Sequence, residues 1–78
     1  MKKTFEMTPK GMFGEWLFVN MMKRNLTCSD VANMLHTTRQ TISNHINNIH
    51  KPTYVWVIAY CSIFGGDPDM LWKTVEES

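Results

Sequence analysis

Residues 27–47 have the sequence TCSDVANMLHTTRQTISNHIN, in which two short helical patterns stand on either side of a turn. Thr27 and Asp30 have the spacing of a capping box, with Asp in place of the usual Glu, and predict the start of a helix. Its apolar positions continue through residues 31–35, and the polar residues 36–38 end it. The first pattern therefore predicts a helix of about two turns.

The second pattern begins at Thr38, whose hydroxyl can cap a helix N-terminus. Ile42 and Ile46 are spaced i, i+4 and share one face of this helix. Asn47 and Asn48 follow, and asparagine tolerates the left-handed conformation that ends many helices. A helix running from near Thr38 to Asn47 is the prediction.

Two short helices joined by a turn of three or four residues are typical of a helix-turn-helix, here over residues 28–47. Ala32 lies where the two helices would cross, so its small side chain permits a close approach. Four apolar residues can fill the space behind it, although they would suit any helical core: Val31, Leu35, Ile42 and Ile46.

The outer face of the second helix favours DNA recognition. Its polar residues, at positions i, i+1, i+4 and i+5, are Arg39, Gln40, Ser43 and Asn44. Arginine can donate twice to the guanine edge, and Gln or Asn can match adenine, each pair being worth about 1 to 3 kcal/mol of discrimination. The competing interpretation is an ordinary solvated face, which more often carries Lys and Glu than Gln, Ser and Asn.

Three further helices are predicted. One starts near Pro9 and ends at Asn25, with the apolar spacing of a helix face at Phe13, Trp16, Leu17 and Met21. Another covers residues 54–64, with Thr53 as its cap and Gly65-Gly66 as its stop. The last opens at Asp67-Pro68 and continues through Leu71 and Val75.

The 54–64 segment is apolar nearly all round, so it is either buried within the monomer or part of an interface. Because residues 53–58 are rich in β-branched side chains, an extended conformation is a minor alternative there. The inward set predicted for the helix is Tyr54, Val57, Ile58, Cys61 and Phe64.

A length of 78 residues allows one domain, and a hydrophobic fraction of 44% argues against disorder. The formal net charge of +1 is weak support for nucleic-acid binding, but it is unevenly distributed. Residues 57–78 carry Lys73 and four carboxylates, a balance of −3, so the first 56 residues carry +4. The N-terminal part is the better suited to phosphates.

Other classes of function have little support. Cys28 and Cys61 lie far apart and no signal peptide opens the chain, which indicates a cytoplasmic protein. The 54–64 segment is too short to cross a bilayer. His45 and His50 lack the paired spacing of a metal site, and His45 is expected to be a partly buried structural histidine. No nucleophile stands with a base, so neither an enzyme nor a cofactor is expected.

The motifs together resemble the Cro and phage repressor helix-turn-helix proteins, the XRE family. Residues 25–32, NLTCSDVA, are similar to the opening of that family's second helix, and residues 37–44, TTRQTISN, to its recognition helix. The match spans residues 13–72. It implies an all-α, compact five-helix lambda-repressor-like domain over residues 9–78, preceded by a flexible arm at residues 1–8.

The resemblance also implies roles for individual residues. Arg39, Gln40, Ser43 and Asn44 would face the bases of the major groove. The residues expected near DNA phosphates are Thr27, Cys28, Thr38, Asn47, His50 and Lys51.

Three departures from the family pattern stand out. Cys28 replaces a common Gln, and a thiol is only a weak donor. His36 replaces the turn glycine, which requires a histidine with positive φ. Met21 and Ile46 occupy the positions of an Arg and Glu pair. Loss of both charges together can be neutral or stabilising, so the two side chains are expected to meet in the core.

A homodimer would double the contacts of one recognition helix, at half-sites about 34 Å apart. The resemblance points to the C-terminal helix as its seam, and the predicted interface residues are Trp56, Met70, Trp72 and Val75.

The sequence thus predicts a phage or prophage transcriptional repressor that occludes a promoter by binding operator DNA as a dimer. Two alternatives stay open. One is an antitoxin that represses its own operon and holds a toxin on its apolar face. The other is a protein-interaction module without DNA binding, which the low net charge favours.

Overall fold

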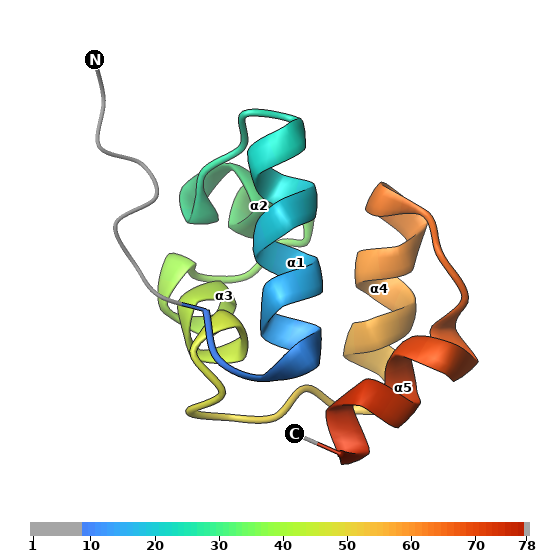
Figure 1. The fold of residues 1–78 in the computed structure, drawn as a ribbon. Helices are drawn as coiled ribbons and strands as arrows, with labels where there is room; N and C mark the ends of the chain where they lie inside the picture. Colours follow the sequence, from blue (N-terminus) through green and yellow to red (C-terminus); the bar gives the residue numbers. More distant parts are fainter. Residues whose placement is uncertain (1–8, 78) are drawn as a thin grey trace.

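Residues 9–77 are described by a computed structural model, and within that range the regular structure is entirely helical (Figure 1). The helices are α1 Gly11–Lys23, α2 Cys28–Met34, α3 Arg39–Ile46, α4 Tyr54–Phe64 and α5 Pro68–Glu76. The predicted all-α class and its five helices are confirmed. The extended alternative for residues 53–58 is wrong, since residues 54–58 are helical and only Thr53, which precedes α4, is extended. The predicted arm at residues 1–8 lies outside the described residues.

The helix ends follow the local signals in the sequence. Thr27 and Asp30 form the predicted capping box at α2, with hydrogen bonds of 2.8 and 3.1 Å. Asp67 caps α5 and Pro68 is its first residue. His36, in the turn between α2 and α3, has the positive φ expected of it, at 58°. Thr53 precedes α4, but its side chain makes no capping hydrogen bond.

Helix α1 lies between two helix pairs, α2 with α3 on one side and α4 with α5 on the other (Figure 1). Ring contacts join it to α4, with Phe13 beside Tyr60 at 5.7 Å and Trp16 edge-on to Phe64 at 6.1 Å between ring centroids. The core is one cluster to which every helix contributes. Its buried apolar residues are Phe13, Leu17, Met21, Cys28, Val31, Ala32, Ile42, Ile46, Val57, Tyr60, Phe64 and Val75.

This core agrees with most of the predicted packing of α2 and α3. Val31, Ala32 and Ile42 are buried, and Leu35 packs against them while partly exposed. Met21 and Ile46 are both fully buried in the same cluster. The expectation that both of these apolar side chains lie in the core is therefore confirmed.

The inward face of α4 differs from the prediction. Val57, Tyr60 and Phe64 are buried, whereas Tyr54 and Ile58 are exposed. A helix that is apolar on all sides carries no periodic signal, so its orientation is set by the helices packed against it. Tyr60, which was not in the predicted set, is fully buried.

Candidate nucleic-acid interface

Residues 35–38 connect α2 to α3, and the two helices pack directly against each other. Each begins with a threonine whose hydroxyl accepts a hydrogen bond from a backbone N–H, Thr27 from Asp30 and Thr38 from Thr41. These caps satisfy backbone donors that the first turn leaves unpaired. The local sequence thus fixes where both helices start.

The predicted base-reading residues share the outer side of α3. Arg39 and Gln40 are exposed, and Ser43 and Asn44 are half-buried. On the opposite side, Ile42 and Ile46 are fully buried, which fixes the rotation of the helix about its axis. The amphipathic arrangement predicted from the sequence is therefore present on α3.

Two of these side chains are joined to each other. The Gln40 amide donates from Nε2 to Oδ1 of Asn44 at 2.9 Å. Each side chain keeps further hydrogen-bonding groups, because an amide offers two N–H donors and a carbonyl with two lone pairs. A pair already held together loses less side-chain entropy when it meets a base edge than two free side chains would.

Ser43 and Asn47 form a second linked pair one turn further on. Asn47 donates from Nδ2 to the Ser43 backbone oxygen at 3.0 Å and to its hydroxyl oxygen at 3.3 Å. The Ser43 hydroxyl is an acceptor in this bond and keeps its own proton for donation. Asn47 is thus turned back along the helix.

The residues predicted near phosphates fall into two groups. Thr38, His50 and Lys51 are exposed, and Thr27 and Asn47 are half-buried. Cys28, the sixth residue of this prediction, is buried in the core, so its thiol, expected to be only a weak donor, is not open to a phosphate. Burial also raises the pKa of Cys28, although the nearby Arg39 charge opposes the shift.

His45 lies on the inner side of α3, where the sequence placed a partly buried structural histidine. Only 6% of it is exposed, and its Nδ1 shares a hydrogen bond of 2.6 Å with the Tyr60 hydroxyl. The Trp56 ring packs edge-on against it at 5.0 Å between centroids. Burial, with a smaller effect of His50, lowers the pKa of His45 to about 4, so the ring is neutral at pH 7.

Two residues that position α3 were missed by the sequence analysis. The backbone N–H of Lys10 donates to the Ile46 carbonyl oxygen at 2.9 Å. Gly14 lies against the same carbonyl so closely that a Cβ at this position would overlap with it. An isolated glycine within an apolar helical pattern was the available signal, since it often marks a close approach.

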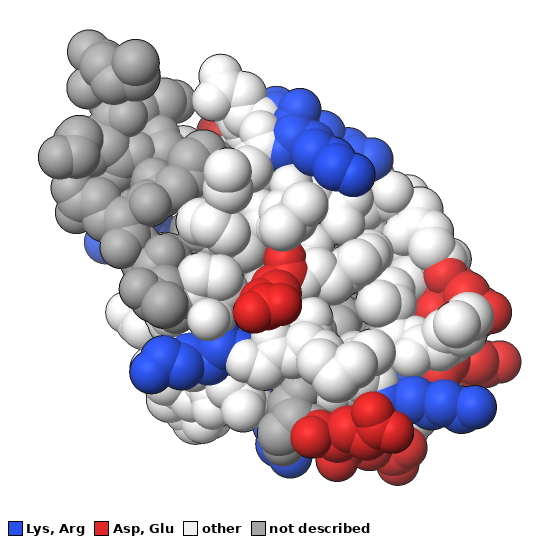
Figure 2. Space-filling view, in the orientation of Figure 1, with Lys and Arg blue, Asp and Glu red and all other residues white. Residues whose placement is uncertain are grey.

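The charge distribution separates the two ends of the molecule. Figure 2 shows acidic side chains gathered over α5 and the turn that leads to it. Between residues 27 and 53 the charged side chains are Asp30, Arg39 and Lys51, so this segment has a balance of +1. Any contact with nucleic acid at α3 would therefore depend more on amides and hydroxyls than on charge.

The residues predicted for a dimer interface differ in their exposure. The prediction for Val75 is wrong, because its side chain is buried in the core at 2% exposure and cannot contact a second chain. Trp56 and Trp72 are half-buried, packed against His45 and Tyr54 respectively. Met70 is well exposed.

No protein-family model, curated protein or solved structure matches this chain. Within residues 9–77 no helix has the length and apolar character needed to cross a membrane. Nor does that part of the chain bring three His, Cys, Asp or Glu side chains together as a group that could hold a metal ion.

Proposed function

We propose that this protein is a sequence-specific DNA-binding transcriptional regulator of the Cro and phage repressor type. In this proposal α2 and α3 act as a helix-turn-helix and α3 enters the major groove. The observation that carries it is the outer face of α3, where Arg39 stands beside the linked amides of Gln40 and Asn44. These groups suit guanine and adenine edges.

The division of labour within α3 supports the proposal. Its inner face is committed to the core through Ile42, His45 and Ile46. The outer face has no apolar side chain and one full positive charge, that of Arg39. Recognition of base edges requires a helix whose position is fixed and whose polar face is open to solvent, because the side chains must be held in register with the bases.

Operator binding as a homodimer and repression by occlusion of a promoter are part of the same proposal. One recognition helix reads only a few base pairs, and a two-fold pair would read an inverted repeat with half-sites about 34 Å apart. With few cations at the surface, the salt dependence of binding should be shallow for a protein of this class.

A second candidate is a protein-binding module, including the antitoxin of a toxin–antitoxin pair. The observation that favours it is the exposed apolar side of α4, where Val55 and Ile58 are 73% and 44% exposed. Exposed apolar patches often mark contacts with other proteins. The low net charge of +1 is consistent with this candidate as well.

The test is selection of bound sequences from a random duplex library, followed by salt titration of the selected site against shuffled DNA. An enriched inverted repeat supports the regulator. Gln40→Ala should then relax specificity at one base position, at a cost of about 1 to 3 kcal/mol. Lys51→Ala should weaken all sequences alike and reduce the salt slope by about 1 for each protomer.

Lys73→Ala provides the matched control, because Lys73 is an exposed lysine on the acidic helix α5. It should change neither specificity nor salt slope. Absence of any enriched sequence, or equal small losses from the Gln40 and Lys51 variants on all DNA, would refute the proposed role of α3 and favour the protein-binding candidate.

A further inference from the structure

The outer face of α1 takes no part in the proposed DNA-binding surface. Met12, Val19 and Met22 are 53%, 45% and 48% exposed, and Glu15 and Lys23 are exposed on the same side of the helix. These positions follow the 3, 4 and 7 spacing of one helical face. Gly14, which packs against α3, points to a different side.

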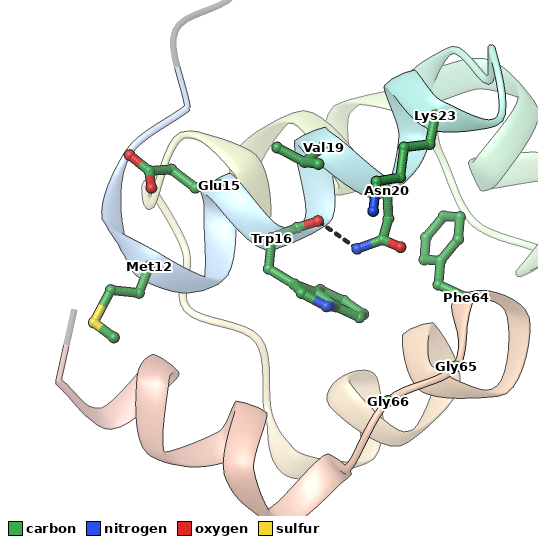
Figure 3. Close-up of a pocket in the computed structure, with 9 residues that line it drawn as sticks. All are labelled: Met12, Glu15, Trp16, Val19, Asn20, Lys23, Phe64, Gly65 and Gly66. Atoms are coloured by element: carbon green, nitrogen blue, oxygen red, sulfur yellow. Dashed lines mark hydrogen bonds between the residues drawn. The ribbon is translucent and has the colours of Figure 1, made fainter.

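One side of an open groove of about 510 Å³ is lined by four residues of this face, Met12, Glu15, Val19 and Lys23, and the other side by the end of α4 (Figure 3). Trp16 projects into the groove between the two walls, and Phe64, Gly65 and Gly66 lie across from α1. The groove thus combines apolar side chains with the two opposite charges of Glu15 and Lys23.

The charges are arranged symmetrically. Glu15 precedes Val19 by four residues and Lys23 follows it by four, so each lies about 6 Å along the helix axis from Val19. Trp16 and Met22 are likewise three residues to either side. A second copy of α1 laid antiparallel, with the two Val19 side chains at the centre, brings each Glu15 level with the partner's Lys23.

We infer that the outer face of α1 binds the same face of a second copy of this chain, antiparallel, with Val19 at the two-fold axis. Such a contact is isologous, which requires a self-complementary surface. Glu15 and Lys23, at the two ends of the face, supply that complementarity, because each lies opposite the other's charge only in the antiparallel orientation. A parallel pair would set like charges opposite each other.

The neighbouring arginine does not compete for this role. Arg24 donates from Nη1 to Asn20 and from Nη2 to the Phe64 carbonyl oxygen at 3.1 Å, and its guanidinium lies 5.0 Å from the centre of the Phe64 ring. It is held against the end of α4. Lys23 is therefore the cation that faces a partner at this end of α1.

The inference does not depend on DNA binding, since α1 and α3 present different surfaces. Its test uses Glu15→Lys and Lys23→Glu in the full chain, compared by sedimentation velocity and native mass spectrometry at high protein concentration. Each variant alone should self-associate about tenfold more weakly than the wild type, because both charge pairs become repulsive.

Mixing the two variants distinguishes this geometry from a general charge effect. In the mixed pair both contacts are attractive again, so heterodimers should form in excess of the statistical proportion. The double variant Glu15→Lys, Lys23→Glu should recover the association of the wild type. Circular dichroism should be unchanged throughout, because both residues are exposed.

Val19→Asp and Val55→Asp form a matched pair, one on α1 and one on α4, both replacing an exposed valine. Val19→Asp should abolish the contact and Val55→Asp should leave it unchanged. The inference is overturned by a wild-type chain that stays monomeric, by a statistical mixture of the charge variants, or by dissociation with Val55→Asp alone. DNA selection with the same variants shows separately whether the proposed function stands.

Discussion

Helices α3 and α4 are neighbours through His45 and Tyr60, yet they are held in the fold by different means. Helix α3 buries Ile42, Ile46 and His45 and is polar outside. It is fastened by a threonine cap, by the hydrogen bond from Lys10 and by the close fit to Gly14. Helix α4 is apolar on all sides and begins without a side-chain cap.

The difference shows how a short polar helix can be given a definite position. Few apolar residues are available to α3, so directional contacts at each end and at His45 determine where it sits. Helix α4 has more apolar side chains to bury, so burial contributes more to its stability than hydrogen bonds such as that between Tyr60 and His45. Substitutions at single contacts should therefore affect α3 much more than α4.

Among the substitutions that compare α3 with α4, Gly14→Ala should lower the free energy of unfolding most. The added methyl group would overlap with the Ile46 carbonyl oxygen, which is backbone and cannot rotate away. Helix α1 must then move away from α3, at a cost of about 3 kcal/mol in the free energy of unfolding. Urea unfolding measures this loss. Ser62→Ala on the exposed side of α4 is the control and should change stability by less than about 0.5 kcal/mol.

Acidification should weaken the link between the two helices. The pKa of His45 is about 4 in the folded chain and 6.5 as the ordinary value, so the unfolded chain takes up the proton first. The stability is complete above pH 6.5, falls as the pH drops from 6.5 to 4, and levels off below. The His45 contribution is about 3 kcal/mol, from a pKa difference of about 2.5 units at 1.36 kcal/mol for each unit.

Unfolding measured across this pH range tests the assignment to His45. His45→Gln should lower stability at pH 7 and remove the drop between pH 6.5 and 4, whereas His50→Gln should keep most of it, because burial is the main cause of the shift. The same acid drop in the His45 variant would assign it to other groups.

The smallest effect compares the two helix caps. Thr38→Ala should cost about 1 kcal/mol, because its hydroxyl accepts a hydrogen bond from the Thr41 N–H at the start of α3. Thr53→Ala should cost less than half of that, since the Thr53 side chain caps nothing at α4. Equal losses in thermal or urea unfolding would contradict the difference seen between the two N-termini.

Local signals in the sequence were sufficient for the helix boundaries. The capping box at Thr27 and the Asp67-Pro68 start depend on residues within one turn of each other, so they are readable without the fold. The same holds for the two faces of α3, whose polar and apolar residues alternate with a clear helical period. For the candidate site, the sequence therefore predicts which residues of α3 face outward and which are buried.

The rest depended on contacts between distant parts of the chain. The buried face of α4, the burial of Cys28 and Val75, and the meeting of Gly14 with Ile46 could not be taken from the local pattern. A helix that is apolar on nearly all sides has no periodic pattern that marks its buried face. Whether a residue near a helix end is buried depends on which neighbouring helices cover it.

Hydrogen bonds and helical periodicity act over a few residues, so the amino-acid pattern alone predicts five helices, most of their ends and the polar outer face of α3. The buried side of α4, the position of α3 against α1 and the apolar side chains left on the surface depend on how the helices pack together. These outcomes follow from packing, in which each helix is oriented by the shapes of the others.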